Sequence, residues 1–165
     1  MSKLKINRSI VVVPILLFSL LSSAAFAQSS SRPFSGMAGR WSGSGTISLA
    51  GGAQERVRCK ATYAIGNNGT VLQQSLRCAS DSYRFELSSD VVSNDGKLTG
   101  TWQEITRNIS GNLQGIATSG RFQAVVSAAA FSANVFLTTR GSSQSVVIRS
   151  EGSEFIGASI TLVRG

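Results

Sequence analysis

Apolar and polar residues alternate with a period of two along most of the chain after Gly39. This alternation is typical of half-buried β-strands, and no segment keeps a 3.6-residue apolar repeat for three helical turns. Turn-forming pairs such as Gly51-Gly52, Asn68-Gly69 and Asp95-Gly96 interrupt the alternation at intervals of roughly 8–15 residues. The pattern therefore predicts an all-β protein in which no helix is required.

Ten strands are predicted, in sequence order and with short connections. They run over residues 40–50, 56–65, 70–80, 82–92, 97–106, 109–117, 121–127, 131–140, 144–150 and 155–164. Short connections favour an antiparallel meander. Because closure removes unprotected edge strands, we expect about 8–10 strands to form a small closed barrel rather than a sandwich. An outer-membrane barrel is disfavoured, since the strands lack aromatic girdles.

The segment from Arg56 to Ser80 is the strongest hairpin, because two alternating arms flank Asn68-Gly69. With these two residues as the loop, Cys59 lies directly opposite Cys78 on the apolar face, as a hydrogen-bonded pair with Cα atoms about 5.5 Å apart. Two cysteines in an exported chain indicate a disulfide. We therefore predict a structural bridge that stabilises the fold by roughly 3 kcal/mol. A redox-active pair is disfavoured, since both sulfurs lie on an apolar face and lack C-x-x-C spacing.

A second turn, Asp95-Gly96, places Trp102 opposite Ser89 and Glu104 opposite Leu87. Glu104 then lies on the inner face, where a carboxylate needs a partner or takes a raised pKa. It is either a polar anchor for a ligand inside the barrel or a residue near the open end, solvated or paired with an arginine. We favour the second alternative, because structural ion pairs also explain such residues.

Three aromatic residues, Trp41, Tyr63 and Trp102, share the predicted inner face. Core packing is the default expectation for them, and a ligand-facing wall that also includes Glu104 is the alternative. Strand glycines such as Gly43 lie on the same face. Glycine at these positions permits close approach of a neighbouring strand.

The first 27 residues are predicted to be a cleaved signal peptide. Lys3, Lys5 and Arg8 precede a short apolar run, and Ala25-Phe26-Ala27 matches a cleavage site. The run is shorter than the roughly 20 residues that span a bilayer. We therefore expect no transmembrane segment after cleavage, and a periplasmic or secreted protein.

The rest of the chain divides into two parts. Residues 28–38 are predicted to be a flexible, Ser-rich lead-in with few groups to bury. Residues 39–165 suit a single β-barrel domain with one core.

The exported chain is moderately basic. Without the three basic residues of the leader, its net charge falls from +8 to +5. Arg56, Arg58 and Lys60 line the outer face of the second predicted strand, and the hairpin places Arg77 opposite Lys60. Like charges directly opposite are unfavourable, so this patch would suit an anionic envelope component such as a glycan or lipid headgroup. Splaying of these long side chains into solvent remains the favoured explanation. Nucleic acid is not predicted, because no exposed aromatics interleave with the patch.

The chain contains no histidine. This excludes Ser-His-Asp and Cys-His catalysis, ordinary zinc sites and His-ligated haem. No S-x-x-K motif surrounds Lys60 or Lys97, and no spacing of acidic residues supports a carboxylate pair or a calcium loop. We therefore predict no catalytic, metal-binding or cofactor-binding residues.

The opening strand, Gly39–Gly45, resembles the G-x-W-x-G-x-G strand of calycin-type barrels, which include lipocalins and nitrobindin-like proteins. Tyr83 and the segments 100–104 and 140–146 also resemble uncharacterised small exported proteins of α-proteobacteria. This resemblance covers most of the mature chain. The calycin resemblance implies a barrel that holds an apolar ligand. Nitrobindin-like members hold haem through a histidine, so that site does not carry over to this chain.

These observations favour an exported, non-enzymatic barrel that supports the envelope or binds a small apolar or anionic ligand. A secreted inhibitor that inserts a loop into a protease or lysozyme is the alternative. An enzyme is disfavoured, because the sequence contains no recognisable combination of a nucleophile, a general base and an oxyanion-stabilising group.

Overall fold

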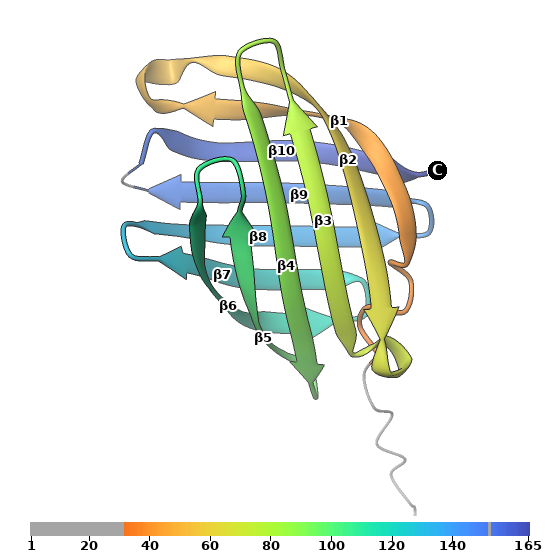
Figure 1. Ribbon diagram of the computed structural model, residues 1–165. Helices are drawn as coiled ribbons and strands as arrows, with labels where there is room; N and C mark the ends of the chain where they lie inside the picture. Colours follow the sequence, from red (N-terminus) through yellow and green to blue (C-terminus); the bar gives the residue numbers. More distant parts are fainter. Residues whose placement is uncertain (1–31, 152) are drawn as a thin grey trace, which may run out of the picture.

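The computed structural model describes residues 32–151 and 153–165, which form a ten-stranded antiparallel barrel (Figure 1). The strands are β1 (Gly39–Leu49), β2 (Gln54–Gly66), β3 (Val71–Ala79), β4 (Arg84–Asn94), β5 (Lys97–Glu104), β6 (Ile109–Thr118), β7 (Arg121–Ala128), β8 (Phe131–Arg140), β9 (Ser143–Glu151) and β10 (Phe155–Arg164). Two short 3₁₀ turns, η1 (Ala50–Gly52) and η2 (Asn67–Gly69), lie in the first two connections. Within these ranges, no helix has the length and apolarity to cross a membrane. The predicted leader, residues 1–27, lies outside the described residues.

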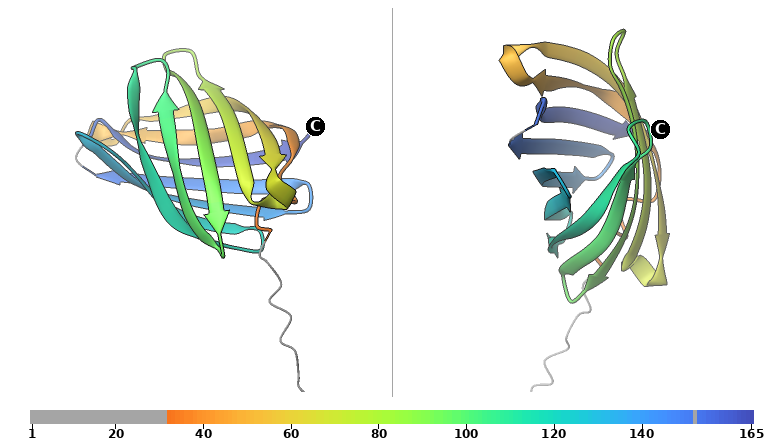
Figure 2. Two further views of the ribbon diagram at one scale, coloured as in Figure 1. Left: turned by 60° about the horizontal axis from the view of Figure 1, so that its bottom comes forward. Right: turned by 60° about the vertical axis from the view of Figure 1, so that its left-hand side comes forward.

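Each strand pairs with its successor, and β10 pairs with β1, so the sheet closes on itself. The predicted all-β meander and its closure into a barrel are therefore confirmed. The strands β2, β3 and β4 cross β8, β9 and β10 steeply, and the views of Figure 2 show these two halves facing each other. Their inner faces can therefore share one core, as in orthogonally packed sheets.

Strand β2 shows how the sequence alternation becomes burial. Val57, Cys59, Ala61 and Tyr63 are buried, and the residues between them are exposed. Because successive side chains of a strand point to opposite faces, one apolar face per strand is enough to build the interior.

The disulfide and its register are confirmed: Cys59 pairs with Cys78, and their sulfurs are bonded. The loop is longer than predicted, because the last strand pair is Gly66 with Val71 and Asn67 has a positive φ of 44°. The Cα atoms of the two cysteines lie 4.1 Å apart. The expected spacing of about 5.5 Å is therefore wrong, and the observed one is closer to the ~4.5 Å of a non-hydrogen-bonded pair.

The inner-face glycines allow neighbouring strands to come unusually close. A Cβ atom on Gly43 would lie 2.0 Å from the carbonyl oxygen of Thr161, and one on Gly111 would lie 1.8 Å from that of Ser127. Both distances are far inside van der Waals contact, so only glycine fits. The predicted close approach at these glycines is confirmed.

The lead-in is not loose over the part that the structure describes. Phe34 and Met37 are each only 1% exposed and belong to the hydrophobic core. The expectation that this segment has few groups to bury is therefore wrong for residues 32–38. Phe34 and Met37 fill the apolar opening of the closed barrel. They are therefore buried although the sequence around them has no apolar periodicity.

Candidate functional site

The barrel has two structurally different ends. In a meander, connections alternate between the ends, so η2, the tight turns 95–96, 119–120 and 141–142, and residues 32–38 all lie at one end, here called the plugged end. The other end, here called the open end, carries η1, residues 80–83, 105–108 and 129–130, and the connection between β9 and β10.

Residues 32–38 close the plugged end. The backbone N–H of Phe34 donates to the carbonyl oxygen of Gly69 over 3.1 Å. The Phe34 ring stacks on Phe122 with centroids 5.5 Å apart. The indole Nε1 of Trp41 donates to the carbonyl oxygen of Met37 over 2.8 Å. These contacts join the lead-in to three separate parts of the barrel.

Arg164, the last residue of β10, also holds the plug in place. Its guanidinium carbon lies 4.6 Å from the centroid of the Trp41 ring. The same side chain donates to the carbonyl oxygens of Ala38, over 2.6 Å, and Gly36. A cation over an indole face is a favourable contact, so Arg164 ties both ends of the described chain together.

A buried polar cluster lies beneath the plug. The Tyr63 hydroxyl donates to Oε1 of Gln144 over 2.6 Å, and Nε2 of Gln144 donates to Oγ1 of Thr139 over 3.1 Å. Burial raises the pKa of Tyr63 well above its usual value, and the hydrogen bond to Gln144 offsets this only in part. Sequence reasoning missed Gln144, although its alternation with Val146 and Ile148 places it on the inner face.

Toward the open end, apolar side chains inside the barrel are only partly buried. Each of them points into the barrel and packs against the core. The set consists of Leu49, Leu87, Leu113, Val135, Ile148 and Phe155. We call this set the open-end wall. Val135 pairs with Ile148, and Leu49 with Phe155, so the exposed apolar surface continues across neighbouring strands. The inward side chains of this half are thus less completely buried than those at the plugged end.

The predicted ligand-facing residues are divided between the two ends. Trp41 and Tyr63 lie at the plugged end, packed edge-to-face with ring centroids 6.4 Å apart. Trp102 and Glu104 lie on β5 in the open half. The Trp102 indole donates to the carbonyl oxygen of Asn112 over 3.2 Å. The four residues therefore do not form one site.

Glu104 is largely buried, and its carboxylate holds the connection between β5 and β6. Its Oε1 accepts the backbone N–H groups of Glu86 (3.0 Å) and Thr106 (3.1 Å), and its Oε2 accepts that of Arg107 (2.7 Å). Arg107 Nη1 lies 3.5 Å from Oε2. Burial raises the pKa of Glu104, but hydrogen bonds outweigh this effect and hold the pKa below its usual value. Glu104 thus lies near the open end and is paired with an arginine, as in the alternative that the sequence analysis favoured.

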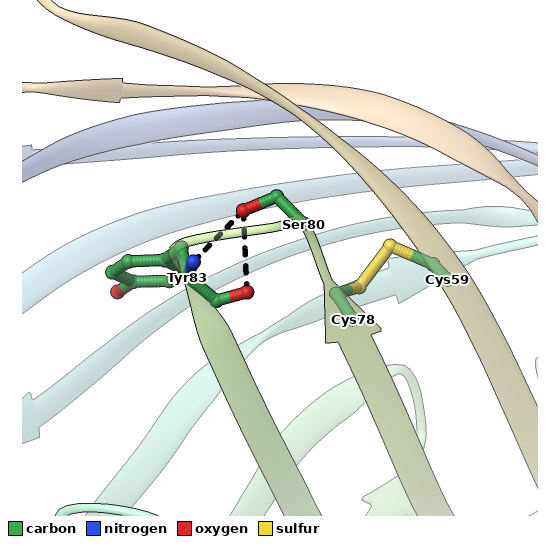
Figure 3. The surroundings of a disulfide bond; sticks show 4 residues. All are labelled: Cys59, Cys78, Ser80 and Tyr83. Carbon is green, nitrogen blue, oxygen red and sulfur yellow. Dashed lines mark hydrogen bonds between the residues drawn. A yellow bond between two sulfur atoms is a disulfide. The ribbon is translucent and has the colours of Figure 1, made fainter.

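The connection between β3 and β4 follows directly after the disulfide (Figure 3). Ser80 and Ser82 donate their hydroxyl protons to the Glu55 carboxylate over 2.5 and 2.6 Å, which lowers the pKa of Glu55. The backbone N–H of Tyr83 donates to Ser80 Oγ over 2.8 Å. The Arg107 guanidinium lies 4.7 Å from the centroid of the Tyr83 ring. The rim of the open end is therefore held by side-chain contacts.

The predicted basic patch is assembled as the register requires, with Lys60 paired to Arg77. Arg77, however, also forms an ion pair with Glu86, with 2.6 Å between Nη2 and Oε1. Part of the patch's charge is therefore balanced within the sheet, and Arg56, Arg58 and Lys60 remain as an exposed basic row.

No family model matches the chain, and no curated protein does. Among solved structures, the barrel is similar to the S-type phycobiliprotein lyase CPES from Guillardia theta, with a TM-score of 0.57 and 12% sequence identity. The match covers 80% of this chain and 90% of that one. At this identity the likeness shows the fold alone, which agrees with the closed β-barrel predicted from the sequence. The resemblance to α-proteobacterial exported proteins stays a prediction.

Proposed function

We propose that the mature protein is an exported, non-enzymatic barrel that binds a small apolar ligand in its open half. The partly exposed open-end wall carries this proposal. Apolar side chains that face into a barrel normally bury one another. Large contiguous patches of exposed apolar surface are rare on soluble monomers, and where they occur they often mark binding sites.

The energetics favour an apolar occupant. Each 100 Å² of apolar surface that a ligand removes from water contributes about 2.5 kcal/mol, before the entropic costs of binding. Because Phe34 and Met37 fill the plugged end, such a ligand has one route of entry. The wall has few polar groups, so shape and size, rather than a set of hydrogen bonds, would select the ligand.

The disulfide supports export. Such bridges form and persist in oxidising compartments and are rare in the cytosol. Together with the predicted leader, it favours the periplasm or the extracellular medium as the place where the barrel acts.

A fluorescent apolar probe, N-phenyl-1-naphthylamine, tests the binding site. Leu113→Gln places an amide in the open-end wall on β6. Ile116→Gln makes the same kind of change on the outer face of the same strand, where Ile116 is 57% exposed. We expect Leu113→Gln to weaken probe binding at least tenfold and Ile116→Gln to change it less than twofold. Equal effects of the two variants, or no saturable binding to the parent protein, would contradict the proposal.

Secreted inhibition of a hydrolase remains a second candidate, because one specific feature favours it. The 80–83 connection is held in place by Glu55, and a pre-ordered loop loses little entropy on insertion into an enzyme cleft. Native mass spectrometry of the protein isolated from its own compartment separates the two candidates. A retained small molecule supports the binding barrel, and a co-purifying protease or lysozyme supports the inhibitor.

A further inference from the structure

Charge is distributed unevenly along the barrel axis of the described residues. The charged residues at the plugged end are Arg32, Arg40, Lys97, Arg121, Arg140, Arg164 and a single acid, Asp95. The acids at or next to the open-end connections are Glu55, Asp81, Glu86, Glu104, Glu151 and Glu154. Arg56, Arg77, Arg84, Arg107 and Arg149 lie beside them, so the open end is close to neutral and the plugged end carries the net positive charge. Such a separation creates a field that draws anions toward the plugged end.

A depression of about 300 Å³ lies at this basic end, where the β6–β7 turn meets the end of β8. It is lined by Thr118, Ser119, Gly120, Arg121, Thr138, Thr139 and Arg140. Apart from the glycine, every lining side chain is a hydroxyl or a guanidinium, and none is a carboxylate. The lining therefore offers many hydrogen-bond donors and two full positive charges.

The strand register brings the two arginines together. Arg121 on β7 pairs with Thr138 on β8, and Arg140 lies two residues farther along the same outer face. Diagonal neighbours on adjacent strands are within reach of long side chains, and like charges at this spacing repel. Neither arginine forms a salt bridge with any of the described residues. An anion between them would relieve this repulsion.

The floor of the depression is fixed. Gly120 has a φ of +70°, and a Cβ atom there would lie 2.6 Å from the carbonyl oxygen of Thr139. The backbone N–H of Thr139 donates to the carbonyl oxygen of Gly120 over 2.7 Å. The Thr139 hydroxyl in turn accepts a hydrogen bond from the buried Gln144. Groups supported in this way keep their geometry without a bound ligand.

We propose that this depression binds a phosphate group, clamped between Arg121 and Arg140. Guanidinium groups recognise phosphate oxygens through paired, charge-assisted hydrogen bonds. The hydroxyls of Thr118, Ser119 and Thr138 supply donors for the remaining oxygens. This site is separate from the proposed apolar site, which opens at the other end of the barrel.

Titration of the disulfide-bonded mature protein with inorganic phosphate, at constant ionic strength, tests the site. Amide signals are followed in ¹H–¹⁵N NMR spectra. We expect saturable shifts at Ser119 and Gly120, and at least a tenfold weaker affinity in the double variant R121Q/R140Q. The variant R121K/R140K keeps the charge but loses the planar fork, so its affinity should lie between those of the parent protein and R121Q/R140Q.

The matched control is R56Q/R58Q, which removes two exposed arginines, two residues apart, from the outer face of β2. It should bind phosphate within twofold of the parent protein. Non-saturable shifts, or equal weakening in R56Q/R58Q and R121Q/R140Q, would overturn the proposal in favour of general electrostatic attraction. All three variants change exposed side chains, and unchanged amide spectra elsewhere would show that they fold.

The source of the phosphate group is tested by co-flotation with vesicles. Vesicles of phosphatidylglycerol would carry the parent protein, but not R121Q/R140Q, if the site takes a lipid headgroup, and free phosphate would then compete. Saturable phosphate binding without flotation would identify a free phosphate or soluble phosphate ester. Flotation that is unchanged by R121Q/R140Q would show that another surface binds the membrane and would exclude this site as the headgroup receptor.

Discussion

Replacing Glu104 by glutamine is the most direct test of how the open end is held. The substitution keeps the size of the side chain and one carbonyl oxygen, but it removes the charge. It also places an NH₂ group against the backbone N–H of Glu86, Thr106 or Arg107, which now donate to the carboxylate. At least one donor then faces another donor at a largely buried position.

The cost follows from these contacts. Hydrogen bonds to charged groups contribute about 1.5–3 kcal/mol each, and a buried donor without an acceptor costs about 1–3 kcal/mol. Because the three bonds share one carboxylate and do not add, we expect a total loss of about 2–3 kcal/mol in the free energy of unfolding. For a domain of this size, that lowers Tm by roughly 6–12 °C.

The effect should depend on pH in a defined direction. Hydrogen bonds hold the folded-state pKa of Glu104 below its value in the unfolded chain. The carboxylate therefore stabilises the fold fully above the unfolded-state pKa of about 4.3, and this contribution is lost as pH falls through the lower, folded-state pKa. Since glutamine does not titrate, the difference between the parent protein and Glu104→Gln should be largest at neutral pH and shrink below about pH 4.

Urea unfolding at several pH values between 7 and 3 measures this difference. Glu86→Gln, on the neighbouring strand, is the matched control: it removes an ion pair to Arg77, whose side chain is 71% exposed, and should cost under about 0.5 kcal/mol. If Glu104→Gln stayed within about 0.5 kcal/mol of the parent protein at pH 7, or if its deficit did not change with pH, the structural role assigned to this carboxylate would be refuted.

Three further changes test other parts of the barrel. Replacing both Cys59 and Cys78 by alanine should lower the free energy of unfolding by roughly 3 kcal/mol, because the 19-residue separation closes a loop of that length in the unfolded chain; an unchanged urea midpoint would contradict this. Phe34→Ala should cost about 3 kcal/mol by differential scanning calorimetry, whereas a loosely attached lead-in would make it neutral. Tyr63→Phe leaves the buried amide oxygen of Gln144 without its donor and should cost about 1–3 kcal/mol in urea unfolding, and a stabilised variant would show that the hydroxyl is not needed there.

The strand order and register were accessible from sequence because local signals determine them. Asp95-Gly96 sets the register of β4 and β5, and that register alone places Glu104 opposite Leu87. The same reasoning located Cys59 opposite Cys78, even though the loop proved longer. Extra loop residues added on both sides of a turn leave the pairing of the arms unchanged.

Contacts that form only when the barrel closes could not be predicted from local sequence signals. Phe34 and Met37 are isolated apolar residues in a polar segment, and their burial depends on an opening that forms only when β10 meets β1. The partners of Glu104 are backbone N–H groups, which carry no sequence signature. Gln144 could have been placed on the inner face by alternation, but not joined to Tyr63, which lies 81 residues away in the chain.

The position of the two proposed sites follows from the topology. In an antiparallel meander with an even number of strands, the first strand begins and the last strand ends at the same end of the barrel. Residues 32–38 and Arg164 therefore meet there. A segment that enters the fold at that end can plug only that end. The partly buried open-end wall lies at the opposite end, where acids and arginines are both present. The basic outer surface of the plugged end is then left free for an anion, and the two ends can bind chemically different partners without sharing a residue.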